Sequence, residues 1–298
     1  MTGTLEAFTE AERPRVEAAV AEAIARLAPP VGAVARYSVG GGGKRLRPLL
    51  TVASHRAVGG ARKGIHAVAA AVELVHTYSL LHDDLPTMDD DGMRRGLPTA
   101  HVVYGPAAAT AAGAALQQRA FLLLADAAGR DFELAPALPR LIRRLARAAG
   151  VEGMVGGQYL DLEAEGRDVD PAGLEAIHRA KTGALISAAC AMGAIAAGAS
   201  EERVDALSDY GASLGLAFQV VDDLLDELGE PSRTGKAAGA DAARRKATYP
   251  SVHGIEGARD QAEAAADVAR DALERLDGDA EGVNVLREYV DFVVERLH

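Results

Sequence analysis

The sequence contains no tryptophan and one cysteine, and aromatic residues make up only 4% of its 298 residues. A single cysteine, Cys190, excludes an internal disulfide framework and fits a reducing compartment. Its neighbours are alanines and a methionine, a setting typical of core packing. Aromatic residues favour strands and alanine is the best helix former, so this composition favours helix.

Basic residues are outnumbered. There are 32 lysines and arginines against 43 aspartates and glutamates, which gives a formal net charge of −11. Proteins that bind nucleic acid present clustered positive charge, so the balance argues against nucleic acid as a partner. A small anion could still bind where cations gather locally or metal ions bridge like charges.

Long hydrophobic runs are also missing. The longest uncharged run, 183–199, is shorter than the ~20 residues of a membrane span, and it consists mostly of alanine and glycine. Residues 1–28 carry five glutamates in an amphipathic pattern, which differs from a signal peptide. We therefore expect a cytoplasmic protein without a membrane span.

Apolar residues recur at helical spacing along most of the chain, and strict apolar–polar alternation persists nowhere. Pro86 disfavours helix at Leu85, so a loop is expected over 87–98 before a helix resumes near 107. We predict one all-α domain over 1–298, with helices at about 11–28, 49–58, 63–84, 135–150, 172–198, 201–228, 248–274 and 281–297.

The sharpest motif places five aspartates within nine residues, from Asp83 to Asp91. Such carboxylates raise one another's pKa unless cations neutralise them, and hard oxygen ligands suit Mg²⁺. A solvated acidic loop is the alternative. Arg94 and Arg95 follow at once, and arginine suits bidentate phosphate recognition, so the combination favours a metal-bound phosphate.

A second aspartate cluster lies about 140 residues further on. Asp222 and Asp226 are four residues apart on an otherwise apolar helix, with Asp223 between them. Burying carboxylates without partners is costly, and a structural salt bridge would satisfy one of them but not readily three. The two clusters predict facing walls of one metal-filled cavity.

Basic residues stand where a diphosphate would need them. Lys44, Arg45 and Arg47 follow four glycines at an expected helix start, where amides and the helix dipole favour phosphate. The glycines alone would also fit a flexible turn. Lys181 lies in an apolar helix, where it needs an anion unless it reaches the surface. Lys236 and Lys246 follow the second aspartate cluster.

In this order the motifs resemble those of trans-polyprenyl diphosphate synthases, most closely the bacterial short-chain farnesyl and geranylgeranyl type. The resemblance spans about 36–255 and rests on Gly-Gly-Lys-Arg-Leu-Arg-Pro, His-Asp-Asp-Leu-Pro-Thr-Met-Asp-Asp-Asp, Arg-Arg-Gly-Leu-Pro-Thr, Lys-Thr-Gly, Phe-Gln-Val-Val-Asp-Asp-Leu-Leu-Asp and Lys-Ala-Thr-Tyr-Pro. It implies a helical bundle around a deep central cavity, a homodimer, and a Mg²⁺-dependent prenyltransferase. That enzyme joins isopentenyl diphosphate head to tail to an allylic diphosphate.

The resemblance also implies residue roles. Two magnesium ions, with Mn²⁺ as an alternative, would be held by Asp83, Asp84 and Asp89, and a third by Asp222, Asp223 and Asp226. The allylic diphosphate would contact Arg94, Lys181, Thr182, Gln219 and Lys236, with Lys246 as a further substrate-binding residue. Isopentenyl diphosphate would contact Lys44, Arg47, His76 and Arg95.

Two positions depart from the family pattern. Ala114 stands where an aspartate is common, and Gly92 replaces a common acidic residue. Neither change removes a residue of the two aspartate motifs, so we expect an effect on efficiency rather than loss of activity.

Product length should depend on the residues four and five positions before Asp83. These are Ser79 and Tyr78, roughly 6–7.5 Å further down the helix. A tyrosine there would act as a floor and favour a C15 product, with C20 as the alternative. Tyr78 could instead be core packing whose ring points elsewhere.

Three other readings stay open. A class I terpene cyclase or a head-to-head coupling enzyme would also ionise an allylic diphosphate, but neither needs the isopentenyl diphosphate site. A non-catalytic subunit of a heteromeric synthase typically lacks one aspartate motif, whereas both are intact here. Consumption of isopentenyl diphosphate distinguishes an elongating synthase from these.

Overall fold

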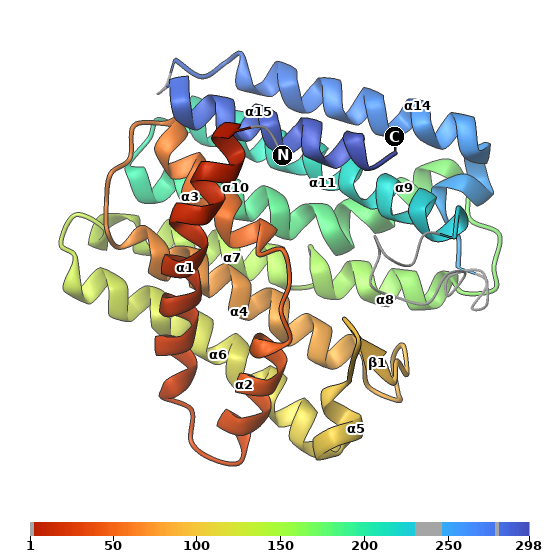
Figure 1. Cartoon of the computed structure of the whole chain (residues 1–298), viewed down its shortest axis with the longest axis horizontal. Helices are drawn as coiled ribbons and strands as arrows, with labels where there is room; N and C mark the ends of the chain where they lie inside the picture. Colours follow the sequence, from red (N-terminus) through yellow and green to blue (C-terminus); the bar gives the residue numbers. More distant parts are fainter. Residues whose placement is uncertain (1–2, 230–245, 278–279, 298) are drawn as a thin grey trace.

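The computed structural model describes residues 3–229, 246–277 and 280–297 (Figure 1). The helices and helical turns in chain order are α1 (Gly3–Ala25), α2 (Val31–Gly40), α3 (Leu46–Ala57), α4 (Ile65–Asp83), α5 (Ala100–Tyr104), α6 (Pro106–Arg130), η1 (Ala135–Ala137), α7 (Leu138–Ala149), α8 (Met154–Ala164), α9 (Pro171–His178), η2 (Arg179–Gly183), α10 (Ala184–Ala197), α11 (Glu201–Glu227), α14 (Tyr249–Leu273), α15 (Ala280–Val294) and η3 (Glu295–Leu297). The all-α prediction is confirmed.

Within the described ranges, the only strands form a two-residue antiparallel hairpin, β1 (Met93–Arg94) with β2 (Leu97–Pro98). The hairpin lies in the predicted 87–98 loop, beyond the C-terminal end of α4 (Figure 1). Helix α4 ends at Asp83, three residues before Pro86, as the proline predicts. The first aspartate motif therefore stands at the end of a core helix rather than within one.

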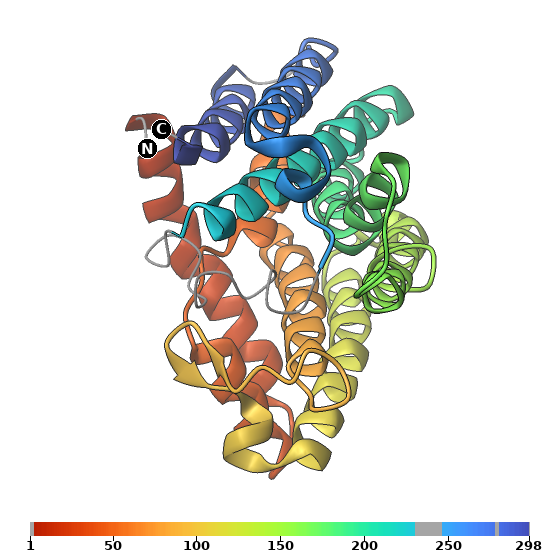
Figure 2. The same cartoon turned by 90° about the vertical axis from the view of Figure 1, so that its right-hand side faces the viewer.

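Three helices form the buried centre. Almost every residue of α10 between Leu185 and Ala196 is buried, and α4 and α11 are buried along most of their lengths. Helix α10 packs on α3, α11 and α4, while α6 covers α4 and α14 covers α11. Figures 1 and 2 show α14 and α15 side by side, with α5 and α6 at the opposite end of the bundle.

The run Pro171–Ala197 is apolar enough for a membrane span, but 72% of its most apolar stretch is buried in the protein, as in a core helix.

Helix ends follow local chemistry. Asp170 caps α9 by accepting a hydrogen bond from the amide of Gly173 at 2.7 Å, and Thr248 with Ser251 forms a capping box at the start of α14. The expected helix ranges agree with the structure to within a few residues, except that the first begins at Gly3 rather than residue 11.

Three helices, α2, the short α5 and α8, were not expected. Helix α8 contains Gly156 and Gly157, which lower helix propensity. Gly157 is nevertheless required, because a Cβ there would lie 2.2 Å from the amide nitrogen of Lys181. Close packing of α8 on η2 therefore overrides propensity, and only the tertiary structure could show this.

Gly193 gives a test of the core. A Cβ at this position of α10 would lie 2.3 Å from the carbonyl oxygen of Thr51 in α3, so Gly193→Ala must push the two helices apart. We expect the free energy of unfolding to fall by about 1–3 kcal/mol, measured by chemical denaturation. The matched control is Gly129→Ala in α6, where no atom would lie within 4 Å of the new methyl group. It should be neutral or stabilising by up to about 1 kcal/mol, and equal losses in both variants would contradict this packing.

Candidate active site

A cavity of about 590 Å³ opens between α4 and α11. Lining residues come from the loop before α3, from α3 and α4, the loop after α4, α8, η2, α11, the segment before α14, and η3. It gathers most of the predicted site residues: Lys44, Arg47, His76, Asp83, Asp89, Arg94, Arg95, Lys181, Thr182, Gln219, Asp222, Asp223, Asp226 and Lys246. Lys236 lies outside the described residues.

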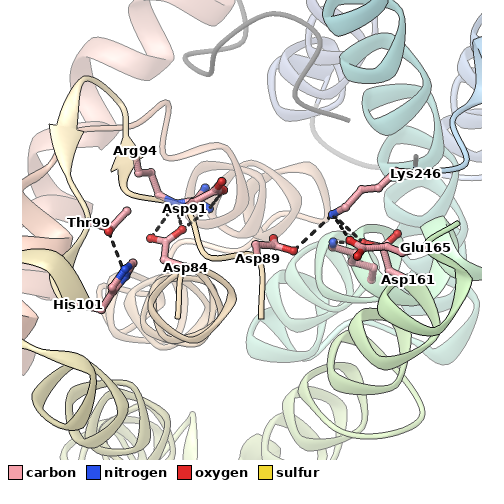
Figure 3. Close-up of polar contacts among 10 residues, drawn as sticks. Asp84, Asp89, Asp91, Arg94, Thr99, His101, Asp161, Glu165 and Lys246 are labelled. Atoms are coloured by element: carbon pink, nitrogen blue, oxygen red, sulfur yellow. Dashed lines mark hydrogen bonds and ion pairs between the residues drawn. The ribbon is translucent and has the colours of Figure 1, made fainter. Parts of the chain in front are cut away.

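The first aspartate motif forms one wall. The loop after α4 folds back so that the amide of Asp89 donates to the carbonyl of Asp83 at 2.8 Å, which brings both side chains to the cavity. Asp84 turns elsewhere. It is 5% exposed and accepts hydrogen bonds from Arg94 Nε at 2.8 Å and Nη2 at 2.6 Å (Figure 3). Asp84 is thus held by Arg94 beside the main cavity rather than on its wall.

The surroundings of Asp83 disfavour its ionised form. Burial raises its pKa to about 6, with Asp89 and Asp84 adding to the rise and Lys181 and Arg94 opposing it. Local cations therefore do not fully compensate the charges at this wall. A divalent cation would stabilise the ionised form.

The second aspartate motif forms the opposite wall. Burial raises the pKa of Asp222, although Arg296 lies 2.7 Å away and opposes the shift. Asp223 is 3% exposed and accepts hydrogen bonds from Gln219 Nε2 at 2.9 Å and the amide of Tyr249 at 3.1 Å. Asp223 therefore also ties α11 to the start of α14. Asp226, one turn beyond Asp222, lines the cavity with it.

Basic side chains connect the walls. Lys246 Nζ lies 3.4 Å from Asp89 Oδ1 and 3.3 Å from Asp161 Oδ2, with Glu165 at 3.9 Å (Figure 3). Lys181 Nζ lies 2.5 Å from the same Asp161 oxygen. Although burial acts to raise the pKa of Asp161, the two lysines together hold it below its ordinary value.

Sequence reasoning did not select Asp161. It stands in α8 near Glu163, with Glu165 just beyond the helix, and nothing in this acidic run identifies Asp161 as the partner of Lys181. The signal was indirect: a lysine predicted inside an apolar helix needs an anionic partner. Arg296, on the second wall, was missed for the same reason, because its partner lies on another helix.

The donor chemistry of the two walls fits Mg²⁺. Among the described residues no three acidic, histidine or cysteine side chains are already gathered as a metal site. Instead Asp89 and Asp222 contact Lys246 and Arg296, which occupy the place of a counter-cation. Carboxylate oxygens from both walls are the ligands that Mg²⁺ prefers, and it completes its shell with water and phosphate oxygens. Binding would require these ion pairs to rearrange.

A second region of the cavity, in which basic side chains predominate, adjoins the first. Arg47 Nη1 lies 3.4 Å from His76 Nε2, and burial lowers the pKa of Arg47 to about 10. Burial also lowers the pKa of His76 well below its ordinary value, with Arg47 and Arg95 contributing, so the imidazole is neutral. Lys44 and Arg95 line the same region. Converging positive groups of this kind suit an anion that needs no metal.

Comparison with known proteins agrees with this geometry. The sequence profile described as polyprenyl synthetase matches residues 29–286. The chain belongs to the polyprenyl synthetase family. This polyprenyl synthetase is 46% identical to a farnesyl diphosphate synthase of Escherichia coli over 90% of this chain and 89% of that enzyme. It is 41% identical to a farnesyl diphosphate synthase of Geobacillus stearothermophilus over 96% and 97% of the two chains.

Solved structures give the same result. An FPP/GFPP synthase of Zymomonas mobilis superposes on this polyprenyl synthetase with a TM-score of 0.85 and 35% identity, covering 99% of this chain and 100% of the other. A polyprenyl synthase of Caulobacter crescentus, complexed with calcium and isoprenyl diphosphate, gives a TM-score of 0.86 and 30% identity over 99% and 97%. The predicted family is confirmed.

The two departures from the family pattern lie away from the cavity wall. Ala114 is exposed on α6 and Gly92 is exposed in the loop before β1. Neither belongs to the cavity lining. The expectation that they spare the activity of this polyprenyl synthetase stays a prediction.

The raised pKa of Asp83 predicts a pH effect. Its folded pKa is raised above its unfolded value of 3.8, so the folded metal-free protein binds more protons between about pH 4 and 6. Its free energy of unfolding should therefore fall as pH rises through this window. Asp83→Asn should raise that energy by about 1–2 kcal/mol at about pH 7.5 and change it little near pH 4, because solvent screens part of the charge effect.

The measurement is denaturant unfolding in the presence of a chelator at both pH values. Asp90→Asn, at an exposed position of the same loop, is the control and should be neutral at both. Loss of stability in Asp83→Asn at the higher pH would show that Asp83 is satisfied without a metal.

Proposed function

We propose that this polyprenyl synthetase condenses isopentenyl diphosphate head to tail with dimethylallyl and geranyl diphosphate, releasing diphosphate and forming C15 farnesyl diphosphate. The observation that carries the proposal is one cavity lined by two carboxylate walls and, beside them, by a group of basic side chains. Two carboxylate walls suit a metal-bound diphosphate, and an adjoining cationic region suits a second diphosphate without metal. A reaction between two diphosphates needs both.

We assign the metal sites to the aspartate motifs. Asp83, Asp84 and Asp89 would hold two Mg²⁺ ions, or Mn²⁺ ions, and Asp222, Asp223 and Asp226 a third. When bound, these ions neutralise the charge that develops on the leaving diphosphate. Asp83, Asp89, Asp222, Asp223 and Asp226 line the cavity, and Asp84 lies beside it. To bind a metal, Asp84 and Asp223 would have to leave their hydrogen bonds to Arg94 and to the amide of Tyr249.

Basic residues of the chain support the same leaving group. Lys181, Arg94 and Lys246 now contact aspartates around the cavity, so they can transfer to diphosphate oxygens without large movements of the backbone. Thr182 donates to Gln219 Oε1 at 2.8 Å, which holds both side chains at the cavity. Thr182 and Lys181 lie in η2, a π-helical turn, and such turns are frequent at functional sites.

The reaction balances with these groups. The allylic C–O bond breaks as diphosphate leaves, and the double bond of isopentenyl diphosphate, held by Lys44, Arg47, His76 and Arg95, attacks the allylic cation. A C–C bond forms, and the departing diphosphate takes the proton whose loss restores an alkene. The apolar side chains around the cavity keep water from the cation.

Tyr78 supports a C15 product. Its side chain is 5% exposed, its hydroxyl donates to the carbonyl of Ala149 at 3.3 Å, and its ring meets the His82 ring edge-on with centroids 5.6 Å apart. Burial raises its pKa to about 12, so the hydroxyl stays neutral. Neither Tyr78 nor Ser79, which donates to the His76 carbonyl, lines the described cavity. The described cavity does not reach this ring, so we propose Tyr78 as a floor that the growing chain would meet beyond the cavity, with C20 as the alternative product.

The competing functions differ in what they require of the site. A class I terpene cyclase takes up no second diphosphate, which would leave the region around Arg47 and His76 without a ligand. A head-to-head coupling enzyme also joins two diphosphates, so incorporation of isopentenyl diphosphate is the property that separates it from an elongating synthase. A non-catalytic subunit would not need both aspartate walls.

We further propose a cytoplasmic homodimer of single-domain subunits, each spanning 1–298. The apolar helical run Pro171–Ala197 lies in the core, which supports the absence of a span. Sedimentation equilibrium measures the assembly, and a monomer at micromolar concentration would contradict the dimer.

The activity is tested with purified protein, Mg²⁺, labelled isopentenyl diphosphate and each of dimethylallyl, geranyl and farnesyl diphosphate, with products read by mass spectrometry. We expect a C15 product. Asp83→Ala and Asp222→Ala should each lower its rate by about 10³-fold or more, because each removes charge that holds the leaving group. Absence of isopentenyl diphosphate from every product would contradict elongation, and activity restored only by a partner protein would favour the subunit reading.

Tyr78→Ala tests the floor. Removing the ring should shift the main product from C15 to C20 or longer, because the growing chain gains the volume that the ring fills. The control is Tyr37→Phe, which removes only a surface hydroxyl that donates to the Pro98 carbonyl. An unchanged product length in Tyr78→Ala would show that Tyr78 is core packing.

A further inference from the structure

A buried ion pair lies beside the cationic region of the cavity. Arg45 Nη1 donates to Glu73 Oε1 at 2.6 Å, and the two side chains are only 6% and 3% exposed. Both residues line the cavity, yet the proposed reaction assigns neither a role. A buried pair of this kind contributes little net stability compared with apolar side chains, so its place at the site calls for another explanation.

Arg45 fixes the loop that carries two of the proposed substrate ligands. Its backbone is left-handed, with φ of 52° and ψ of 32°, at the N-cap of α3. Its Nη2 donates to the carbonyl of Val39 at 2.6 Å, so one guanidinium ties the end of α2 to α4. Lys44 precedes Arg45 directly and Arg47 follows two residues later. Because the side chain of Arg45 is anchored, the backbone that carries Lys44 and Arg47 is held in position.

Glu73 brings negative charge to a region that must bind an anion. It lies on α4 one turn before His76. After burial, its charge is the largest influence on the pKa of both Arg47 and Arg95, and it acts to raise each. A carboxylate this close to both arginines would also repel a diphosphate bound to them, and charges are weakly screened in a buried setting. The bond to Arg45 offsets that charge.

We propose that Arg45 and Glu73 form a positioning pair for isopentenyl diphosphate. Arg45 holds the loop of Lys44 and Arg47 in place, and it offsets the Glu73 charge that otherwise opposes the second diphosphate. Glu73 in turn fixes the Arg45 guanidinium. This inference rests on the proposed function, because it assumes that Lys44, Arg47, His76 and Arg95 bind isopentenyl diphosphate. The pair acts through these residues and need not touch the substrate.

The test separates the two substrates kinetically. Arg45→Met should raise KM for isopentenyl diphosphate by about tenfold or more, while KM for the allylic diphosphate changes by less than about twofold. KM does not depend on the fraction of active enzyme, so partial unfolding of the variant leaves the comparison valid.

The double variant Arg45→Met/Glu73→Gln gives a second readout. Removing the carboxylate that loses its partner in Arg45→Met should recover most of the loss, bringing KM for isopentenyl diphosphate to within about threefold of the unmodified protein. A role in folding alone would make the double variant no better than Arg45→Met. Either that result, or equal rises in both KM values, would overturn the proposal.

Glu12 supplies a matched control. It is a fully buried carboxylate in α1, with Arg15 Nη1 at 2.8 Å, His66 Nε2 at 2.7 Å and a hydrogen bond from Arg56, and it does not line the cavity. Glu12→Gln should lower the thermal midpoint while leaving the ratio of the two KM values unchanged. A shift in that ratio as large as that of Arg45→Met would overturn the proposal.

The proposed function and the role of the positioning pair can be disproved separately. If the unmodified protein incorporates no isopentenyl diphosphate, the proposed function is wrong. If it does, and Arg45→Met leaves KM for isopentenyl diphosphate unchanged, only the positioning pair is wrong.

Discussion

Everything in this structure depends on holding carboxylates of like charge at the walls of one cavity in an apolar bundle. Asp83 ends a core helix and Asp222 lies within another, and burial raises the pKa of both. Such groups are costly unless cations meet them. The buried apolar core of α4, α10 and α11 offsets the free-energy cost of these carboxylates. The loops and the C-terminal end provide cations that lie against them.

Cations of the chain itself lie against these carboxylates. Arg94 holds Asp84, Lys246 lies near Asp89, and Arg296 lies on Asp222 with its guanidinium over the Phe218 ring. Lys181 is held by Asp161. The basic groups proposed to grip the leaving diphosphate are therefore the ones that stabilise the site before substrate arrives. Under the proposed function, binding would exchange one set of ion pairs for another, which requires rearranged side chains rather than a new fold.

The features that could be predicted from the sequence are those marked by local patterns. The helix ranges, the end of α4 before Pro86 and both aspartate motifs follow from composition, periodicity and spacing, and their residues meet in one cavity. Sequence reasoning failed where the cause is a distant partner. The partners of Asp161, Arg296 and Arg45 lie on other elements, so these pairings carry no local signal, and the turn of Asp84 toward Arg94 depends on the hairpin. Helix α8 forms despite its glycines because η2 packs against it.

The most direct test of the central claim, that the carboxylate walls form a metal-dependent diphosphate site, is calorimetric titration with a thio analogue of dimethylallyl diphosphate that does not ionise. The account predicts saturable binding with Mg²⁺ present and loss of at least about 10²-fold in affinity with a chelator, because the metal must neutralise the walls before a second anion can enter. Equal affinity in Mg²⁺ and in chelator would contradict the account, since the chain's own cations would then suffice.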